Sequence, residues 1–502
     1  MEKDEFANLD KDTLIDLYVT TMIENEKLKE AFGDLQYENQ EQKAELTSNK
    51  INSSSTTSSK PPSQDWSTKR PQSFKEVNKM VSEYLGDKPV EEPAHRGKQP
   101  NSKGYGKKLP ENCEKTIIKC IPSECSNCPK KDLCNDHVTA TRNVYDIKIV
   151  ETLTTYKVCE RSCTDKDGAV LSGQAPEGVN SSFQYGIMIK ILTIILYFLG
   201  FSYNRIGMVF ESLIGKNKPS DGTLFNIVKK FGTSDSLKKS YDSIFQTLKN
   251  KHGVLHADET GIRGNKKTFW LHTICDKLFS YCFISKFRGF KAMVEGGTAL
   301  LAGNILVHDC WASYFKIQDI FHSLCNAHII RNLAGIYIYY KQEWAIKLIV
   351  LLMEIYNKKK EAIEKGLKKF EDNIIQEYKN AVLQLVDEGI NSNPLTDDQK
   401  DKKRPKRSNP LKVAMRIKDH VDQFLGFINN FDIPFSNNIA ERTIRSAKIK
   451  IKNSGYLEEE GAKMYAQIYS VLHTSIKQEY LLSDVITKLI LGQDIHFINY
   501  SQ

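Results

Sequence analysis

Two aspartates of this chain each end a short run of apolar residues. Asp258 follows Val254-Leu-His-Ala, and Asp309 follows Asn304-Ile-Leu-Val-His. Apolar runs of this length are typical of buried strands, and an Asp at the end of a core strand lies at the rim of a sheet, where a ligand can reach it. If the strands are neighbours, the two carboxylates repel each other unless a cation lies between them. The pattern favours a metal site, although either Asp could instead be a turn residue.

A third carboxylate, Glu441, falls in a segment predicted to be a helix with Ser436 as its N-cap. Four apolar positions at the spacing i, i+4, i+7 and i+11 form one face that can pack on a core: Ala440, Ile444, Ala447 and Ile451. One residue further round, the same spacing aligns a carboxylate with three cations: Glu441, Arg445, Lys448 and Lys452. A carboxylate suits a metal ion and cations suit phosphates, so this helix favours a phosphodiester substrate. The alternative is a surface helix with an intrahelical Glu441–Arg445 pair.

Seven of the 11 cysteines fall between Cys113 and Cys163. Two chelating pairs, Cys125-Ser-Asn-Cys128 and Cys159-Glu-Arg-Ser-Cys163, are separated by residues 129–158. Two strands are expected between them, at 143–149 and 150–156, and these would present all four thiolates to one structural zinc ion. Three further cysteines could each replace a ligand: Cys113, Cys120 and Cys134. A disulfide module is the alternative, and it requires an exported protein.

The segment Cys325-x-x-His328 also has metal-ligand spacing. No second pair lies near it in the sequence, and free cysteines are often buried in protein cores. We therefore interpret Cys325 and His328 as a structural pair behind the sheet, not as half of a second metal site. The chain has no Gly-x-x-x-x-Gly-Lys-Ser/Thr phosphate loop, so nothing in it predicts the use of ATP.

The bulk composition bounds the class of protein. The chain has 502 residues, which is room for about three domains, and its 40% hydrophobic content argues against global disorder. The net charge of +9 supports a nucleic-acid partner only weakly. Met1–Asp10 is acidic without an apolar core, so we expect no secretory signal and a cytoplasmic, nucleoid-associated protein. The apolar stretch 185–203 contains Lys190, and we expect a buried helix there, not a membrane span.

The N-terminal segments carry patterns that leave two interpretations each. Within residues 12–46, Leu14, Leu28 and Leu35 recur at multiples of seven, which fits a dimerising coiled coil and a solvated amphipathic helix equally well. Residues 47–73 are rich in Ser and Pro and are predicted to be a linker. His95–Lys108 carries five cations and no acid, so it is either a basic arm that follows phosphates or a solubilising linker.

Helices and strands are expected through the rest of the chain. Tyr203–Ile214 and Ser220–Phe231 are similar to a helix-turn-helix, although many such pairs do not touch DNA. Strands are expected at 254–258, 267–275, 278–285, 304–309 and 322–328, with a hairpin turn at Asp276-Lys277. Helices are expected at 290–302, 329–390 and beyond 411. Lys402–Arg407 is a basic loop to which the sequence assigns no role.

Four ordered motifs resemble those of the insertion-sequence-66 transposases: His256-Ala-Asp-Glu-Thr260, Asp309-Cys-Trp-Ala-Ser-Tyr314, Cys325-Asn-Ala-His-Ile-Ile-Arg331 and Asn437-Asn-Ile-Ala-Glu-Arg442. The later Lys452-Asn-Ser-Gly455, Gly461-Ala462 and Tyr469-Ser470 are similar too. The resemblance spans most of the chain and implies an α/β fold, with an RNase H-like catalytic core and a helical insertion before the final carboxylate. Matched motif by motif, the three acidic positions are Asp258, Asp309 and Glu441.

We therefore expect six segments along the chain. Residues 1–50 are a coiled-coil helix, 51–108 a flexible linker with the basic arm, and 109–178 a zinc-ribbon-like module with four cysteines. Residues 179–250 are a helical, candidate DNA-binding domain. Residues 251–455 are the RNase H-like core with a helical insertion at about 335–430, and 456–502 are C-terminal helices.

The resemblance implies a DDE-type transposase that acts by metal-assisted phosphoryl transfer. Two Mg²⁺ (or Mn²⁺) ions on Asp258, Asp309 and Glu441, about 4 Å apart, would clamp the attacking and leaving oxygens. Water frees a 3′-hydroxyl at the element end, and this hydroxyl attacks target DNA. Four cations of the helix are expected to contact DNA: Arg442, Arg445, Lys448 and Lys452. The expected partners are element-end and target DNA, further copies of the chain and accessory transposition proteins, with no membrane.

Two other classes of protein share parts of this pattern. A zinc-ribbon DNA-binding regulator without catalysis explains the first 250 residues equally well, but it does not explain three carboxylates in their expected settings. An RNase H-like nuclease without strand transfer has the same active site as a transposase. A strand-transfer assay with labelled element ends separates the nuclease from the transposase.

Overall fold

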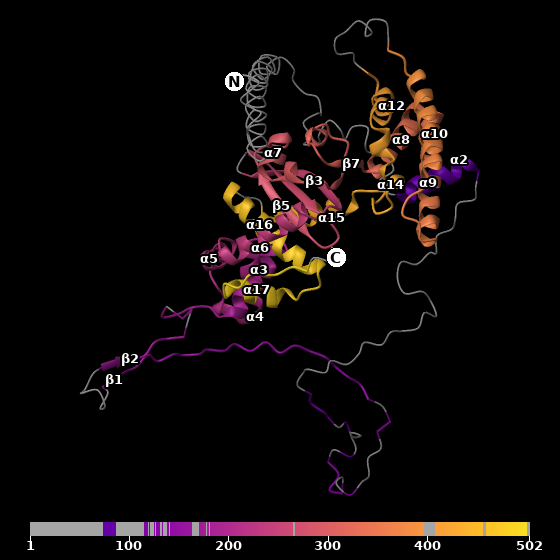
Figure 1. The fold of residues 1–502 in the computed structure, drawn as a ribbon. Helices are drawn as coiled ribbons and strands as arrows, with labels where there is room; N and C mark the ends of the chain where they lie inside the picture. Colours follow the sequence, from indigo (N-terminus) through magenta and orange to yellow (C-terminus); the bar gives the residue numbers. More distant parts are fainter. Residues whose placement is uncertain are drawn as a thin grey trace, which may run out of the picture. The chain divides into compact units, whose positions relative to one another are not determined.

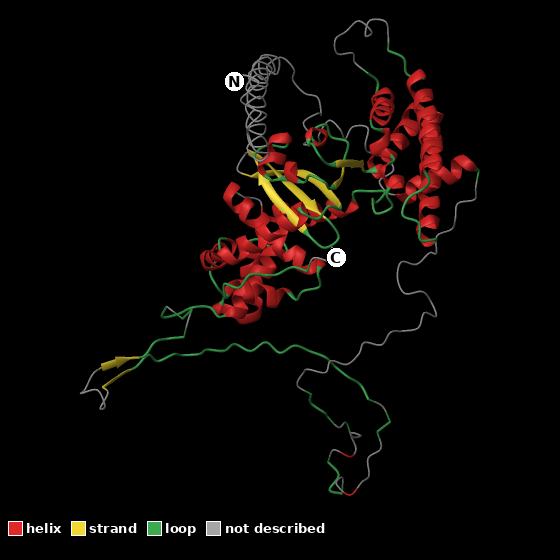
Figure 2. Cartoon of the chain, viewed as in Figure 1, coloured by secondary structure: helices red, strands yellow, loops and turns green. Residues whose placement is uncertain are grey.

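The computed structural model describes residues 74–86, 181–264, 267–395, 407–454 and 458–498, together with parts of 115–179 (Figures 1 and 2). The chain divides into two compact units, one with residues 1–87 and 176–502 and one with residues 88–175. Three expectations lie outside the described residues: the coiled-coil helix at 1–50, the basic arm at 95–108 and residues 402–406 of the basic loop.

Four helices follow one another in the larger unit before the first strand of the sheet: α3 (Ile187–Phe198), α4 (Tyr203–Ile214), α5 (Asp221–Gly232) and α6 (Asp235–Lys249). Ser202, Ser220 and Ser234 precede the last three helices. Each serine side chain accepts a hydrogen bond from the backbone N–H three residues later, which caps the helix. The short 3-10 turn η6 (Gly215–Asn217) separates α4 from α5. The two helices predicted by the helix-turn-helix pattern are therefore confirmed.

The apolar stretch at 185–203 forms α3 inside a helical layer. Ile191, Ile194 and Tyr197 are buried, and α3 packs against α5, α16 (Glu459–Lys477) and α17 (Leu482–Ile490). Across the part of the chain that the structure describes, no helix is long and apolar enough to cross a membrane. The expectation of a buried helix is confirmed.

A five-stranded sheet forms the centre of the larger unit, in the order β5-β4-β3-β6-β7 (Figure 2). Its strands are β3 (Val254–Gly264), β4 (Lys267–Cys275), β5 (Ser280–Ser285), β6 (Ile305–His308) and β7 (Phe321–Leu324). The first three in chain order form an antiparallel meander, whereas β6 pairs parallel to β3 and β7 parallel to β6. The sheet is therefore mixed, with the long strand β3 at its centre.

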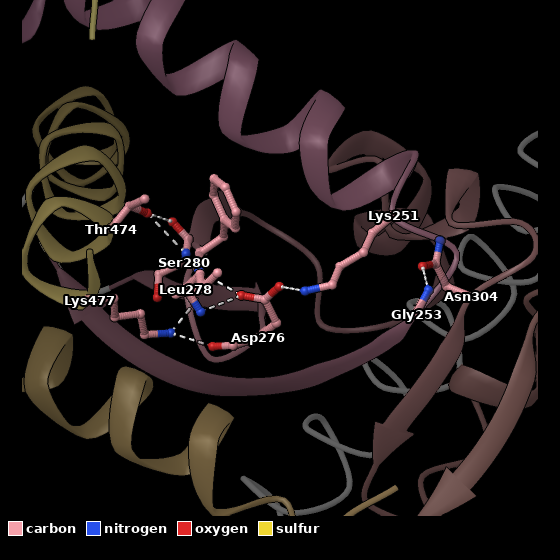
Figure 3. A network of polar contacts seen from close by, with 9 residues as sticks. Lys251, Gly253, Asp276, Leu278, Ser280, Asn304, Thr474 and Lys477 are labelled. Carbon is pink, nitrogen blue, oxygen red and sulfur yellow. Dashed lines mark hydrogen bonds and ion pairs between the residues drawn. The ribbon is translucent and has the colours of Figure 1, made fainter. Parts of the chain in front are cut away.

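The turn between β4 and β5 is fixed by a polar network (Figure 3). The Asp276 carboxylate accepts hydrogen bonds from the backbone N–H groups of Leu278 and Phe279 and forms an ion pair with Lys251, just before β3. Lys477, at the end of α16, donates to the backbone oxygens of Asp276 and Phe279. This network joins three parts of the chain and confirms the predicted turn at Asp276-Lys277.

Two helices from the C-terminal part of the chain pack on the sheet. α15 (Asn438–Ser454) lies against β3 and β4, and α16 lies against β5 (Figure 1). Ala440, Ile444 and Ala447 are buried, as the apolar face of α15 predicts. The helix begins after Asn437, whose backbone oxygen accepts the N–H of Glu441. The N-cap expected at Ser436 is therefore wrong by one residue, because α15 begins directly after Asn437.

A second hydrophobic core is built by the helices between β7 and α15. These are α8 (Asn326–Tyr340), α9 (Glu343–Glu364), α10 (Asp372–Asn391), α12 (Asn409–Asp419), α13 (Val421–Phe424) and α14 (Gly426–Asn429). α2 (Phe74–Leu85) packs against α9 and buries Val77 in the same core. The helical character expected for this part of the chain is confirmed.

Two expected elements differ in the structure. The strand expected at 322–328 ends at Leu324, and Asn326 already begins α8. The helix expected at 290–302 is split into α7 (Phe290–Glu295) and the 3-10 turn η7 (Thr298–Leu300). The reason for the split is Gly297, which has a φ of 81° and breaks the helix in a left-handed conformation.

The smaller unit contains one short antiparallel pair, β1 (Glu160–Ser162) and β2 (Val170–Ser172). The strands expected at 143–149 and 150–156 are wrong, since neither segment forms a strand. Ile147 and Val150, which the pattern would bury, are 84% and 63% exposed. An isolated strand pair without a hydrophobic face to pack is marginal in water, which accounts for the difference.

Candidate active site

Asp258 on β3 and Asp309, just after β6, occupy matching positions relative to the parallel pairing of these two strands. β3 and β6 run parallel with His256 opposite Val307, and each aspartate follows two residues beyond this pair. Residues two apart on a strand share a face, so the register brings the carboxylates together. The backbone N–H groups of Glu259 and Trp311 donate to the Oδ1 atoms of Asp258 and Asp309, respectively. These bonds fix both side chains at the rim where parallel pairing ends.

The pKa of Asp258 reflects both its burial and the acidic groups around it. Burial raises the pKa of Asp258 to about 8, and the charges of Glu259, Asp309 and Glu441 add to this effect, against the lowering hydrogen bond from Glu259. Burial is thus the main cause of the raised pKa, and repulsion from the neighbouring carboxylates is a smaller one.

Contacts of Asn437, which directly precedes α15, hold the helix that carries Glu441 beside β3. The buried amide of Asn437 donates to the backbone oxygen of Ala257 at 2.7 Å and forms a hydrogen bond with Nδ1 of His256 at 2.9 Å. Glu441 follows one helical turn later, with its side chain 12% exposed. The start of α15 is thus attached to β3 directly beside Asp258.

The two oxygens of Glu441 have different surroundings. Oε2 lies 3.3 Å from the guanidinium of Arg445, which is the intrahelical pair that the sequence offered as an alternative. Oε1 is buried without a hydrogen-bond partner and faces Nδ1 of His328 at 3.8 Å. Glu441 can therefore form its pair with Arg445 and still lie near Asp258 and Asp309.

Cys325 and His328 lie beside Glu441, not behind the sheet. Cys325 precedes α8, and its Sγ accepts the backbone N–H of Asn437 at 3.1 Å. Burial lowers the pKa of His328, although the neighbouring charge of Glu441 opposes this. Both residues line a pocket of about 210 Å³ together with Asp309, Trp311 and Arg416. The interpretation as a structural pair is corrected, because the helix begins earlier than expected and turns both side chains toward the carboxylates.

Glu259 lies next to Asp258 and has its own hydrogen-bond partners. Its carboxylate accepts hydrogen bonds from Arg288 and, at 2.7 Å, from the hydroxyl of Tyr314. The Arg288 guanidinium lies over the rings of Trp270 and Trp311, at 4.8 and 4.4 Å from their centroids. Burial and the charge of Asp309 raise the pKa of Glu259, whereas Tyr314 and Arg288 lower it. Glu259 therefore stabilises the strand that carries Asp258.

The cations predicted on α15 take different positions. Arg442 and Arg445 are exposed, and Arg445 is 74% exposed despite its pair with Glu441. Lys448 turns inward and donates to the hydroxyl of Thr260 at 2.8 Å, two residues after Asp258 on β3. The side chain of Lys452 lies outside the described residues. Two arginines are thus available on the surface beside the carboxylates.

The residues present fit divalent cations. Asp258 lies on β3, Asp309 lies just after its parallel neighbour β6, and Glu441 lies in the first turn of α15. Carboxylate oxygens are the ligands that Mg²⁺ and Mn²⁺ prefer. The charges of Asp309 and Glu441 contribute to the raised pKa of Asp258, although burial is its main cause.

The predicted zinc module is described only in part. The backbone N–H of Cys128 donates to the oxygen of Cys125, which closes a turn across this pair, and Cys159 directly precedes β1. Cys163, Cys113 and Cys134 lie outside the described residues, whereas Cys120 is described and exposed. The zinc site stays a prediction.

Sequence reasoning missed Asn437, Arg288 and Tyr314, and it misplaced His328. Asn437 and His328 both occur in the motifs that carry the family resemblance, and this was the signal that could have found them. Tyr314 ends the motif that begins at Asp309, whereas Arg288 becomes visible only when the fold places it beside Glu259.

A mixed α/β fold with acidic residues on neighbouring strands and on a packed helix fits the domain of a transposase. Residues 182–464 match the model of the IS66 transposase family. The chain belongs to this family and is a transposase, an enzyme that acts on DNA. The matched region contains Asp258, Asp309 and Glu441 and begins after the cysteine module. Comparison with curated proteins gave no match.

Proposed function

We propose that this transposase cuts DNA at the ends of an insertion sequence and joins the freed 3′-hydroxyl to target DNA at Asp258, Asp309 and Glu441. The observation that supports this most is the parallel pairing that aligns Asp258 with Asp309, together with the hydrogen bond from Asn437 that attaches the start of α15 to β3 beside Asp258. The charges of Glu259, Asp309 and Glu441 add to the burial that raises the pKa of Asp258. Such a cluster needs cations, and cations between carboxylates can also hold a phosphodiester.

The core that carries the site is proposed to be RNase H-like. The strand order β5-β4-β3-β6-β7 supports this, with the acidic residues on the central strand β3 and just after its parallel neighbour β6. The helices from α8 to α14 form the insertion before the last carboxylate. An insertion at this place leaves the two strands adjacent and brings Glu441 back to them through Asn437.

Different residues would contribute metal binding, positioning of α15 and DNA binding. Two Mg²⁺ or Mn²⁺ ions bound by the carboxylates would stabilise the attacking and leaving oxygens. Asn437 and Lys448 hold α15 to β3 at Ala257 and Thr260, on either side of Asp258 and Glu259. Arg442 and Arg445, on the exposed face of the same helix, would bind the phosphates that flank the reacting one.

Other segments are proposed to bind partners. The α4–α5 pair would contact DNA through the exposed Lys229 and Lys230 at the end of α5. The cysteine module at 109–178 would hold structural zinc, residues 1–50 would join copies of the chain, and accessory transposition proteins would assist. Each of these proposals rests on the sequence pattern of its segment.

Duplex DNA with labelled element ends tests the function. The purified protein with Mg²⁺ should cut at the element end and join the labelled 3′-end to a target duplex. Cleavage without joining would favour an RNase H-like nuclease. Sequence-specific binding without cleavage would favour a zinc-ribbon regulator.

A further inference from the structure

The beginnings of two helices bring three different metal-ligand types together. Cys325 directly precedes α8, His328 lies in its first turn, and Glu441 lies in the first turn of α15. The ligand atoms of the three side chains all lie within 4.8 Å of one another. The i, i+3 spacing of Cys325 and His328 places both on one side of α8, toward Glu441.

Two atoms of this group lack a hydrogen-bond partner. Nδ1 of His328 and Oε1 of Glu441 are both buried and unpartnered, at a distance of 3.8 Å from each other. This distance is too long for a hydrogen bond. Buried polar atoms without a hydrogen bond are unfavourable, so a group that binds both at once is favoured at this position.

The third atom, Sγ of Cys325, indicates that the bound group is a metal ion that accepts sulfur ligands. Asn437 donates its backbone N–H to this sulfur and so holds the sulfur in place. Zn²⁺ binds Cys, His and carboxylate ligands at about 2.0–2.3 Å, which implies ligand-to-ligand distances of roughly 3.3–3.8 Å in a tetrahedron. The separation of His328 and Glu441 already falls at the upper end of this range. Mg²⁺, in contrast, prefers oxygen ligands alone.

Cys325 and His328 line a pocket of about 210 Å³, which can supply water as a fourth ligand. Three protein ligands with one open position form the usual arrangement of an accessible zinc site, in which water completes the tetrahedron. The arrangement is therefore open to exchange with solution, unlike a closed structural site.

We propose that Cys325, His328 and Glu441 form a binding site for a thiophilic divalent ion, Zn²⁺, next to the three-carboxylate site. Glu441 belongs to both groups, so an ion held by Cys325 and His328 withdraws Glu441 from Asp258 and Asp309. Zinc then inhibits the Mg²⁺-dependent reaction. Zinc binding itself stands independently of the proposed function, whereas the inhibition rests on that function.

Zinc content at a fixed low free concentration, set by a chelating buffer, tests the binding. The full-length protein and the variants Cys325→Ser and His328→Ala are dialysed to equilibrium and analysed for metal. Each variant should hold one zinc equivalent less than the wild type. Cys310→Ser is the matched control, because this cysteine lines the same pocket but lies outside the donor group.

The folding of each variant is checked by its thermal unfolding. His328→Ala replaces a side chain that is 44% exposed, so its fold should be preserved even if Cys325→Ser unfolds. A zinc content of folded His328→Ala equal to that of the wild type overturns the proposal. A loss of one equivalent that Cys310→Ser does not show supports it.

Cleavage assays then test the inhibition. Adding low zinc to a Mg²⁺ reaction should reduce cleavage by wild type and Cys310→Ser about tenfold or more, which corresponds to 1.4 kcal/mol of competing binding. His328→Ala should lose most of this sensitivity. Zinc binding without inhibition would refute the competition for Glu441. The absence of any cleavage with Mg²⁺ alone would instead count against the proposed function, and the zinc-content result would still stand.

Discussion

The side-chain amide of Asn437 donates a hydrogen bond to the backbone oxygen of Ala257 at 2.7 Å. Ala257 directly precedes Asp258, and Asn437 directly precedes the helix that carries Glu441. One buried side chain therefore sets the distance between two acidic residues that are far apart in the sequence.

Replacing Asn437 by Ala should harm stability and cleavage together. The substitution removes the bonds to Ala257 and His256 and leaves buried polar atoms unpaired, which costs about 1–3 kcal/mol. Because Glu441 loses its fixed position, cleavage should fall more than the loss of folded protein explains. Urea unfolding and cleavage rates measure the two effects. Asn438→Ala, at an exposed neighbour, should change neither. Equal cleavage by Asn437→Ala and wild type would contradict the positioning role.

Glu259→Gln should lower stability more than it lowers cleavage per folded molecule. The carboxylate is 1% exposed and pairs with Arg288, which is 43% exposed, so the loss should be about 1–3 kcal/mol. Its strand neighbour Asp258 points to the other face and should keep its function. Denaturant unfolding and cleavage by the folded fraction test this. A cleavage loss as large as that of Asp258→Asn would place Glu259 in the site itself.

Lys450 should make stability depend on pH. Burial lowers the pKa of Lys450 to about 7, whereas the unfolded chain keeps a lysine pKa of about 10.4. Between these values the unfolded state binds more protons, so the free energy of unfolding rises with pH from about 7 to 10. Lys450→Met should lose this part of the rise. Urea unfolding at pH 7 and pH 9 measures it, and an equal rise in both proteins would contradict the buried state of Lys450.

The cysteine module should hold its own zinc. Cys159→Ser should lose about one equivalent, because a four-thiolate site tolerates few missing ligands. This loss should add to that of His328→Ala in the double variant, since the two sites share no ligand. Metal analysis of well-folded protein is the test. A module that keeps its zinc without Cys159 would exclude this residue as a ligand.

The local parts of the fold could be predicted from the sequence, and the contacts between distant segments could not. The periodicity of α4 and the apolar runs before Asp258 and Asp309 are local signals, and the structure has a helix and two strands that begin close to the expected places. The strand expected to end at Asp258 instead continues to Gly264, because β3 pairs with β4 along this whole length. The strand pairing that sets the two aspartates level depends on register, which no local pattern encodes.

The errors at the site have the same origin. The sequence predicts a strand over 322–328 that includes His328, whereas the strand ends at Leu324 and Asn326 begins a helix. The segments 143–149 and 150–156 were expected to be strands, but their apolar residues, such as Ile147 and Val150, have nothing to pack against. In both cases tertiary packing decided between two local possibilities.

Cleavage of a duplex carrying the element end, with Mg²⁺ or Mn²⁺, tests the central claim most directly. Asp258→Asn, Asp309→Asn and Glu441→Gln should each reduce cleavage by about a hundredfold or more, because an amide keeps the shape of the side chain but loses the charge that holds a divalent ion. The three losses should not add, since the residues act as one unit. Asp319→Asn, at an exposed position between β6 and β7, should cleave like the wild type. Cleavage retained in all three site variants would contradict the account.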